Sequence, residues 1–175
     1  MGNSRTEIQA ITFHLAKETY GIDVHQIKEI IKTREYVKVP NAPQFVEGVI
    51  NLRGQITPIV DLRKIFEVET RKEDDNSRII MVDLNSEVIG LIVDSVVGVV
   101  TVPAEEIVKS PSLTVSASNT FISGIIRTES QLIILIDVTK LMEDHGAGTG
   151  TFKGLGAVVD QAKDMLMTND LNISA

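Results

Sequence analysis

Short runs of Ile, Val and Leu, separated by Gly, Pro, Asn, Asp and Ser, follow one another along most of the chain. This pattern is typical of many short β-strands joined by turns. It predicts an all-β fold. The predicted strands cover residues 8–15, 20–24, 49–52, 56–60, 79–84, 88–93, 96–102, 121–126 and 132–136.

Two of these runs predict strands in different environments, one buried on both faces and one at a sheet edge or bulged. Residues 132–136 are five consecutive apolar residues, which indicates a strand buried on both faces. The run 56–60 contains Pro58, which cannot donate a hydrogen bond to a neighbouring strand. We therefore expect the strand with Pro58 to lie at a sheet edge or to be bulged.

The sequence also contains an internal duplication. Segments 48–66 and 124–142 align at an offset of 76, with five identical pairs among nineteen. Segments 20–31 and 89–100 align at an offset of 69, in the same order. Two copies of one structural unit are therefore expected. The copies differ where the first has Asn51-Leu52-Arg53-Gly54 and the second has residues 127–130, and we expect function at this asymmetry.

An aspartate follows one matched strand in each copy. Asp61 and Asp137 each precede apolar residues with helical spacing. An aspartate in this position can accept hydrogen bonds from the free N–H groups of a short helix. We interpret the two aspartates as helix caps rather than as a catalytic pair.

The chain is predicted to contain one domain over residues 1–143. Its subdomains are expected at about 17–77 and 78–143, with strand 7–16 shared or completing a barrel, and the charged run 69–77 is interpreted as the linker between them. A Gly-rich linker (144–156), a short amphipathic helix (157–168) and a tail (169–175) follow. This helix is expected to pack loosely; docking on its own domain or on a partner is the alternative.

Composition narrows the function classes. The 24 acidic and 17 basic residues give a net charge of −7, which disfavours binding to nucleic acid and anionic membranes. There is no cysteine, so thiolate metal sites and disulfides are excluded. No apolar run is long enough for a signal peptide or a membrane span. A cytoplasmic protein without direct membrane insertion is expected.

Reactive motifs are not found in the sequence. The three histidines are scattered, and no nucleophile elbow, phosphate-binding glycine loop or calcium loop is complete. Asp23, Asp94 and residues 73–75 could hold a cation, but they lack a known ligand pattern. We expect a non-enzymatic interaction module without catalytic residue, cofactor or metal. The alternative, a small β-barrel enzyme or ligand carrier, would need a deep pocket with convergent titratable side chains.

Four motifs in order resemble the bacterial CheW family of chemotaxis coupling proteins. They are Tyr20-Gly21-Ile22-Asp23-Val24, residues 43–54, residues 58–63 and residues 90–96, and the similarity extends over about residues 7–143. The resemblance implies two SH3-like five-stranded barrels, packed around a shared hydrophobic core, with short helices. It also implies an adaptor that couples chemoreceptors to the histidine kinase CheA. A detached regulatory domain of the kinase or a CheV-type coupling domain is the nearest alternative.

The resemblance further implies partners and site residues. The cytoplasmic tip of a chemoreceptor would bind between the subdomains, and the CheA regulatory domain would pair barrel to barrel with a monomeric adaptor recruited to receptor arrays. Arg53 and Glu29 are expected to form an ion pair at the groove edge, although Arg53 could instead be a solvated turn residue. Gly21, Gly48 and Gly90 could instead be bulge or turn glycines that contact no partner, and Ile27, Val96 and Val99 could be core residues. The implied partner-binding residues are Arg53, Glu29, Ile27, Gly48, Asn51, Leu52, Gly54, Gly90 and Val99.

Overall fold

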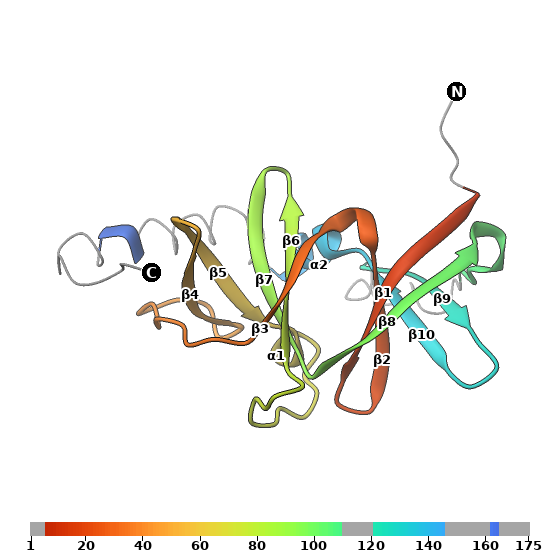
Figure 1. The fold of residues 1–175 in the computed structure, drawn as a ribbon, viewed down its shortest axis with the longest axis horizontal. Coiled ribbons are helices and arrows are strands. Elements are labelled where there is room, and N and C mark those ends of the chain that lie inside the picture. Colours follow the sequence, from red (N-terminus) through yellow and green to blue (C-terminus); the bar gives the residue numbers. More distant parts are fainter. Residues whose placement is uncertain (1–5, 110–120, 146–161, 165–175) are drawn as a thin grey trace.

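The computed structural model describes residues 6–109, 121–145 and 162–164. Their strands form two five-stranded sheets, which lie side by side in Figure 1. Sheet 1 has the strand order β8-β1-β2-β10-β9, and sheet 2 has the order β3-β6-β7-β5-β4. The all-β prediction is confirmed.

The bounds of the elements are as follows. Sheet 1 contains β1 (Glu7–Leu15), β2 (Glu18–Asp23), β8 (Ser95–Pro103), β9 (Ile122–Arg127) and β10 (Leu132–Ile136). Sheet 2 contains β3 (Ile27–Lys32), β4 (Val46–Leu52), β5 (Gln55–Asp61), β6 (Arg78–Leu84) and β7 (Glu87–Val93). The helices are α1 (Leu62–Ile65) and α2 (Val138–His145), with 3₁₀ turns η1 (Val24–Gln26) and η2 (Ala104–Glu106).

The duplication is visible in the strand orders. Aligning β1–β5 with β6–β10 makes the two sheets equivalent, strand for strand. Each sheet, however, contains three strands of one copy and the first two strands of the other. The predicted division into 17–77 and 78–143 is therefore corrected, because β1 and β2 complete the sheet of the second copy and β6 and β7 complete that of the first. Strand β1 does complete a sheet, between β8 and β2.

The charged run 69–77 also has a different place from the predicted one. It joins α1 to β6, and both β5 and β6 belong to sheet 2. The run is thus a connection within one barrel rather than a linker between two. The copies exchange strands through other segments, namely η1 and Asp94.

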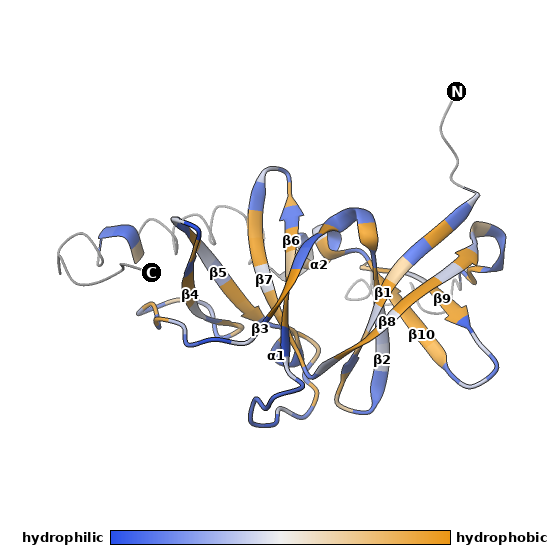
Figure 2. Ribbon diagram, viewed as in Figure 1, coloured by the Kyte–Doolittle hydropathy of each residue, from blue (hydrophilic) through white to orange (hydrophobic). Residues whose placement is uncertain are grey.

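A shared hydrophobic core connects the two sheets, as expected. The largest cluster of buried side chains takes residues from both sheets and from both helices. In β6, Ile80 and Val82 enter this cluster, whereas Ile79 and Met81 enter a smaller cluster on the other face of sheet 2. This alternation follows from the two-residue period of a strand. Figure 2 shows hydrophobic residues along the strands and hydrophilic residues concentrated in the turns.

Strand β5 corrects the edge position predicted for Pro58, and the irregularity in the β4–β5 pairing lies between Val46 and Gly48, opposite Val60 and Ile59. Strand β5 is an inner strand, between β7 and β4. Pro58 pairs with Val49, whose backbone N–H and carbonyl group form 2.9 Å hydrogen bonds with Val37 on the other side of β4. The pairing of β5 with β7 begins only at Ile59. Neither neighbour therefore requires an N–H group at position 58, so a central strand tolerates proline there.

Strand β3 was not predicted. Its sequence contains Lys28, Glu29 and Lys32, which interrupt the apolar run. It is an outer strand of sheet 2, where charged side chains are commonly found because they discourage pairing with other chains.

Three residues of the predicted carboxy-terminal helix lie among the described residues. Residues 162–164 are helical, and Ala162 is 2% exposed within the shared core cluster. At this residue the docking alternative is supported over loose packing. Helix α2 extends to His145, into the predicted Gly-rich linker. The rest of the linker, helix and tail lies outside the described residues.

Candidate partner-binding site

The Asn51-Leu52-Arg53-Gly54 segment forms the tip of the β4–β5 hairpin. Arg53 and Gly54 are the two turn residues, with φ values of 52° and 81°. A two-residue turn with both φ values positive matches the right-handed twist of the strands that it joins. The Asn51 Oδ1 accepts a 2.9 Å hydrogen bond from the Gly54 backbone N–H. Asn51 and Gly54 therefore hold the turn that presents Arg53.

Arg53 forms a bidentate ion pair with Glu29 of β3. Its Nη1 donates to Glu29 Oε1 at 2.6 Å and its Nη2 donates to Oε2 at 2.9 Å. The hydrogen bond from Arg53 is the main reason why the pKa of Glu29 lies below its ordinary value. The predicted pairing is confirmed, and Arg53 is at the same time an exposed turn residue.

This ion pair lies at the surface and joins two outer elements of sheet 2. The side chain of Arg53 is 71% exposed and that of Glu29 is 23% exposed. Strands β3 and β4 are the two ends of the sheet order, so the pair bridges its two edges. An exposed pair adds little stability because water and salt screen it. Its geometry instead gives the barrel a defined charged edge.

Within the described residues, the second copy has no comparable edge. In its hairpin, the backbone N–H of Thr128 donates to the Gln131 carbonyl at 2.9 Å, and Glu129 and Ser130 occupy the turn. Glu129 therefore takes the position of Arg53 and reverses its charge. The asymmetry that was predicted to carry function is present in the structure.

Gly48 and Gly90 have clear packing roles. A Cβ atom on Gly48 would lie 2.4 Å from the Val37 carbonyl oxygen, which belongs to the segment paired with β4. A Cβ atom on Gly90 would lie 2.6 Å from Ile59 Cδ1 and 2.7 Å from Ile79 Cγ2. Gly90 is buried, so it can affect a partner only through the position of its neighbours.

The three apolar site residues differ in exposure. Ile27 is half-buried and packs against the shared core, and Leu52 is half-buried against the smaller cluster of sheet 2. Val99 is 59% exposed on β8, the outer strand of sheet 1, so the core interpretation of Val99 is wrong. The structure thus brings together Glu29, Arg53, Asn51 and Gly54, and places Val99 on the other sheet.

A buried ionic network between the sheets was missed by sequence reasoning. The Arg63 side chain, 4% exposed, donates through Nε and Nη2 to the two carboxylate oxygens of Asp61, both at 2.9 Å. Its Nη1 donates to Asp94 Oδ1 at 3.0 Å. Asp61 also caps α1, as predicted, by accepting from the Arg63 backbone N–H. These carboxylates raise the pKa of Arg63 above its ordinary value. Spacing in the sequence gave no signal for the Arg63–Asp94 contact.

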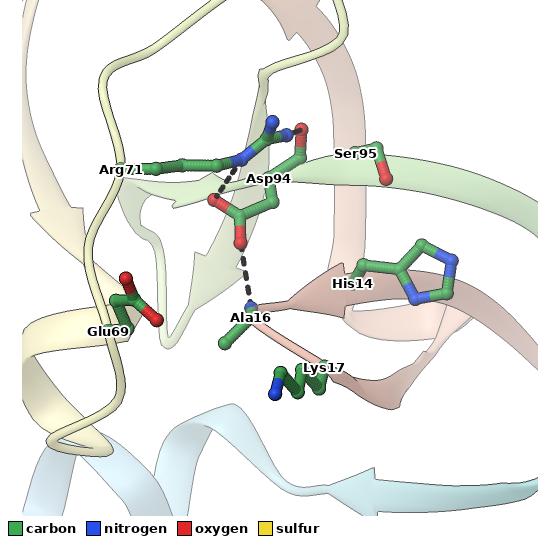
Figure 3. Close-up of a pocket in the computed structure, with 7 residues that line it drawn as sticks. All are labelled: His14, Ala16, Lys17, Glu69, Arg71, Asp94 and Ser95. Carbon is green, nitrogen blue, oxygen red and sulfur yellow. Dashed lines mark hydrogen bonds and ion pairs between the residues drawn. The ribbon is translucent and has the colours of Figure 1, made fainter.

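Arg71 extends this network to the surface (Figure 3). Its Nη2 donates to the Asp94 carbonyl at 3.0 Å, and its Nε lies 3.4 Å from Asp94 Oδ1. Asp94 Oδ2 accepts a 2.7 Å hydrogen bond from the Ala16 backbone N–H. The pocket beside these groups has a volume of about 370 Å³. Its lining residues are His14, Ala16, Lys17, Glu69, Arg71, Asp94 and Ser95, none of which was a predicted site residue.

Among residues 6–109, 121–145 and 162–164, no group of three or more His, Cys, Asp or Glu side chains is arranged to hold a metal ion. In the same part of the chain, no helix is long and apolar enough to cross a membrane. Asp94, which was considered as a cation ligand, is instead paired with Arg63 and Arg71.

Two SH3-like barrels with a shared core and a charged surface edge define a protein-interaction scaffold rather than a ligand carrier. Comparison with known families identifies the class more closely, because residues 9–146 match the model of the CheW-like domain. The chain belongs to the CheW family of chemotaxis coupling adaptors.

Individual relatives agree with this assignment. The chain is 34% identical to the chemotaxis protein CheW of Klebsiella aerogenes over 135 residues, which cover 77% of this chain and 81% of that protein. It is 32% identical to CheW of Bacillus subtilis over 158 residues, covering 90% and 97%. The crystal structure of the scaffolding protein TtCheW from Thermoanaerobacter tengcongensis matches with a TM-score of 0.72 and 37% identity, covering 82% of this chain and 97% of that chain.

Proposed function

We propose that this protein is a non-enzymatic adaptor that couples the cytoplasmic tip of a chemoreceptor to the regulatory domain of the histidine kinase CheA. Membership of the CheW family is the observation that carries this proposal. The protein acts as a cytoplasmic monomer that is recruited to membrane receptor arrays. Binding, rather than chemistry, is its activity.

The Arg53–Glu29 edge is the proposed contact with the receptor. Arg53 is fixed by its bidentate pair and yet remains largely exposed, so its remaining hydrogen-bonding capacity faces solvent. Fixed charges at the rim of an interface chiefly steer association and select partners. Ile27, Gly48, Asn51, Leu52 and Gly54 shape or support this edge. The exposed Val99 offers an apolar contact on sheet 1, and Gly90 acts indirectly through packing.

Co-sedimentation with a receptor cytoplasmic fragment and CheA tests the coupling function. The protein should sediment with both partners and should increase receptor-dependent kinase activity. Arg53→Glu should weaken receptor binding, whereas Glu129→Lys, the matched charge reversal on the second hairpin, should not. If the parent protein binds neither partner and leaves kinase activity unchanged, the proposal is wrong.

A further inference from the structure

The chain passes between the two sheets at two equivalent places. It crosses from β2 to β3 through η1, and from β7 to β8 through Asp94. His25 of η1 and Asp94 correspond in the duplication, at the offset of 69. The two crossings therefore have the same topology, so any difference in their stiffness must come from the side chains around them.

The Asp94 crossing is fastened to both sheets. On the side of sheet 1, the Asp94 backbone N–H donates to the His14 carbonyl at 3.0 Å, and Oδ2 accepts from the Ala16 N–H at 2.7 Å. On the side of sheet 2, Oδ1 accepts from Arg63, which Asp61 holds at the end of β5. A continuous set of bonds thus connects the β1–β2 hairpin to β5.

Burial makes this connection strong and directional. The side chains of Arg63, Asp61 and Asp94 are only 4–5% exposed, so solvent screens their attraction weakly. A planar guanidinium fixes the directions of its hydrogen bonds, which an ammonium group does not. Ala16 has a φ of 54°, a conformation that is unfavourable for alanine and is held here by the bond to Asp94.

The described contacts at the η1 crossing are different: Asp23 Oδ1 accepts a 2.9 Å hydrogen bond from the His25 backbone N–H and lies 2.8 Å from His25 Nδ1. Thr139 stands at the position equivalent to Arg63, and Asp137 at that of Asp61. Asp137 Oδ1 accepts a 3.3 Å hydrogen bond from the Gln26 Nε2, and Gln26 Oε1 accepts one of 3.4 Å from the Val138 N–H. These two bonds are longer than the bonds that Arg63 donates to Asp61 and Asp94, and their donors are neutral.

We propose that Arg63 is a positioning residue that fixes the angle between the two barrels through the Asp94 crossing. This inference deepens the proposed function and rests on it for its consequence. Glu29 follows η1 by three residues, so a partner that binds the Glu29–Arg53 edge acts close to the other crossing. Arg63 thereby determines how far apart the two barrels lie where the partner binds between them.

Distance measurement between spin labels tests the proposal in the free protein. The chain has no cysteine, so Glu87→Cys on sheet 2 and Ser130→Cys on sheet 1 place labels at two exposed positions without other changes. The parent should give one narrow distance distribution. Arg63→Gln should broaden or shift it, and Arg63→Lys should fall between, because lysine cannot hold both carboxylates in the same geometry.

Arg78→Gln is the matched control. The Arg78 guanidinium donates to the carbonyls of Asp75 and Ser77 and not to the Arg63 network. The substitution therefore removes a nearby positive charge and leaves that network intact. Should Arg63→Gln fail to fold, Arg71→Gln replaces it, since the Arg71 side chain is 48% exposed. Folded variants of Arg63 and Arg71 with distributions identical to that of Arg78→Gln would overturn the proposal. Because no partner is present, this result is independent of whether the coupling function holds.

Discussion

The Arg53–Glu29 pair illustrates how one surface contact can matter for binding more than for stability. Arg53 is 71% exposed, so solvent screens the pair and its loss should hardly change the urea midpoint of unfolding. Arg53→Ala and Glu29→Ala should instead slow association with a receptor fragment and reduce its salt dependence. Stopped-flow measurements on both single variants and the double variant check this. Rate losses that simply multiply in the double variant would show that the pair does not act as a unit.

Alanine substitutions of two strand glycines distinguish a packing role from a role in partner contact. Gly90→Ala should destabilise the protein by about 1 to 3 kcal/mol, because its Cβ atom would overlap Ile59 and Ile79 in a filled core. Gly98→Ala is the matched control on β8, since nothing lies within 4 Å of its added Cβ atom. Urea unfolding of both variants gives the comparison. Equal stability of the two would contradict the close packing at Gly90.

Tyr36 provides a pH-dependent test of a half-buried contact. Burial, and then the nearby Glu47 carboxylate, raise the pKa of Tyr36 to about 12. An unfolded tyrosine ionises near pH ~10, so the stability that this neutral phenol contributes is present below pH ~10 and is lost as the pH rises towards 12. The chain has two tyrosines and no tryptophan. In a Tyr20→Phe background, the phenolate absorbance of Tyr36 should therefore appear only well above pH ~10. Ionisation near pH ~10 would refute the burial effect.

At the scale of elements, the sequence predicted the strands better than their partners. Apolar runs located most strands, and the duplicated aspartates correctly marked two helices. Strand β3 was missed because its charges suit an outer strand. The exchange of strands between copies was missed because ladder hydrogen bonds join backbones, and duplicated apolar patterns fit either copy equally well. Arg53 and Glu29 were predicted through family motifs, whereas the buried Arg63–Asp94 contact has no pattern in sequence spacing.

The outer strands of the two sheets differ in a way that separates two of the predicted site residues. Val97 and Val99 are 52% and 59% exposed on β8, whereas Ile27 of β3 packs against the shared core. Val99→Asp should change stability by no more than about 0.5 kcal/mol and should weaken partner binding. Ile27→Asp should destabilise the fold by at least about 2 kcal/mol, because it places a charge against apolar groups. A Val99→Asp variant that keeps full receptor and kinase binding would remove Val99 from the site.

At the scale of the whole molecule, exchange of strands makes the two copies depend on each other. Sheet 2 needs β6 and β7 between β3 and β5, and sheet 1 needs β1 and β2 between β8 and β10. The shared core likewise takes side chains from both copies. A partner that binds one barrel therefore contacts a sheet built from strands of both halves of the sequence.

This dependence predicts that the halves of the sequence cannot fold separately. A fragment of residues 1–77 keeps the β1–β2 and β4–β5 hairpins but loses the strands that join β3 to β5, and isolated hairpins are marginal in water. Neither this fragment nor residues 78–175 should show cooperative urea unfolding alone. An equimolar mixture should regain the circular dichroism of the intact chain and elute as one species in gel filtration. Cooperative unfolding of fragment 1–77 alone would instead mean that each copy forms its own barrel, with exchange of strands unnecessary for stability.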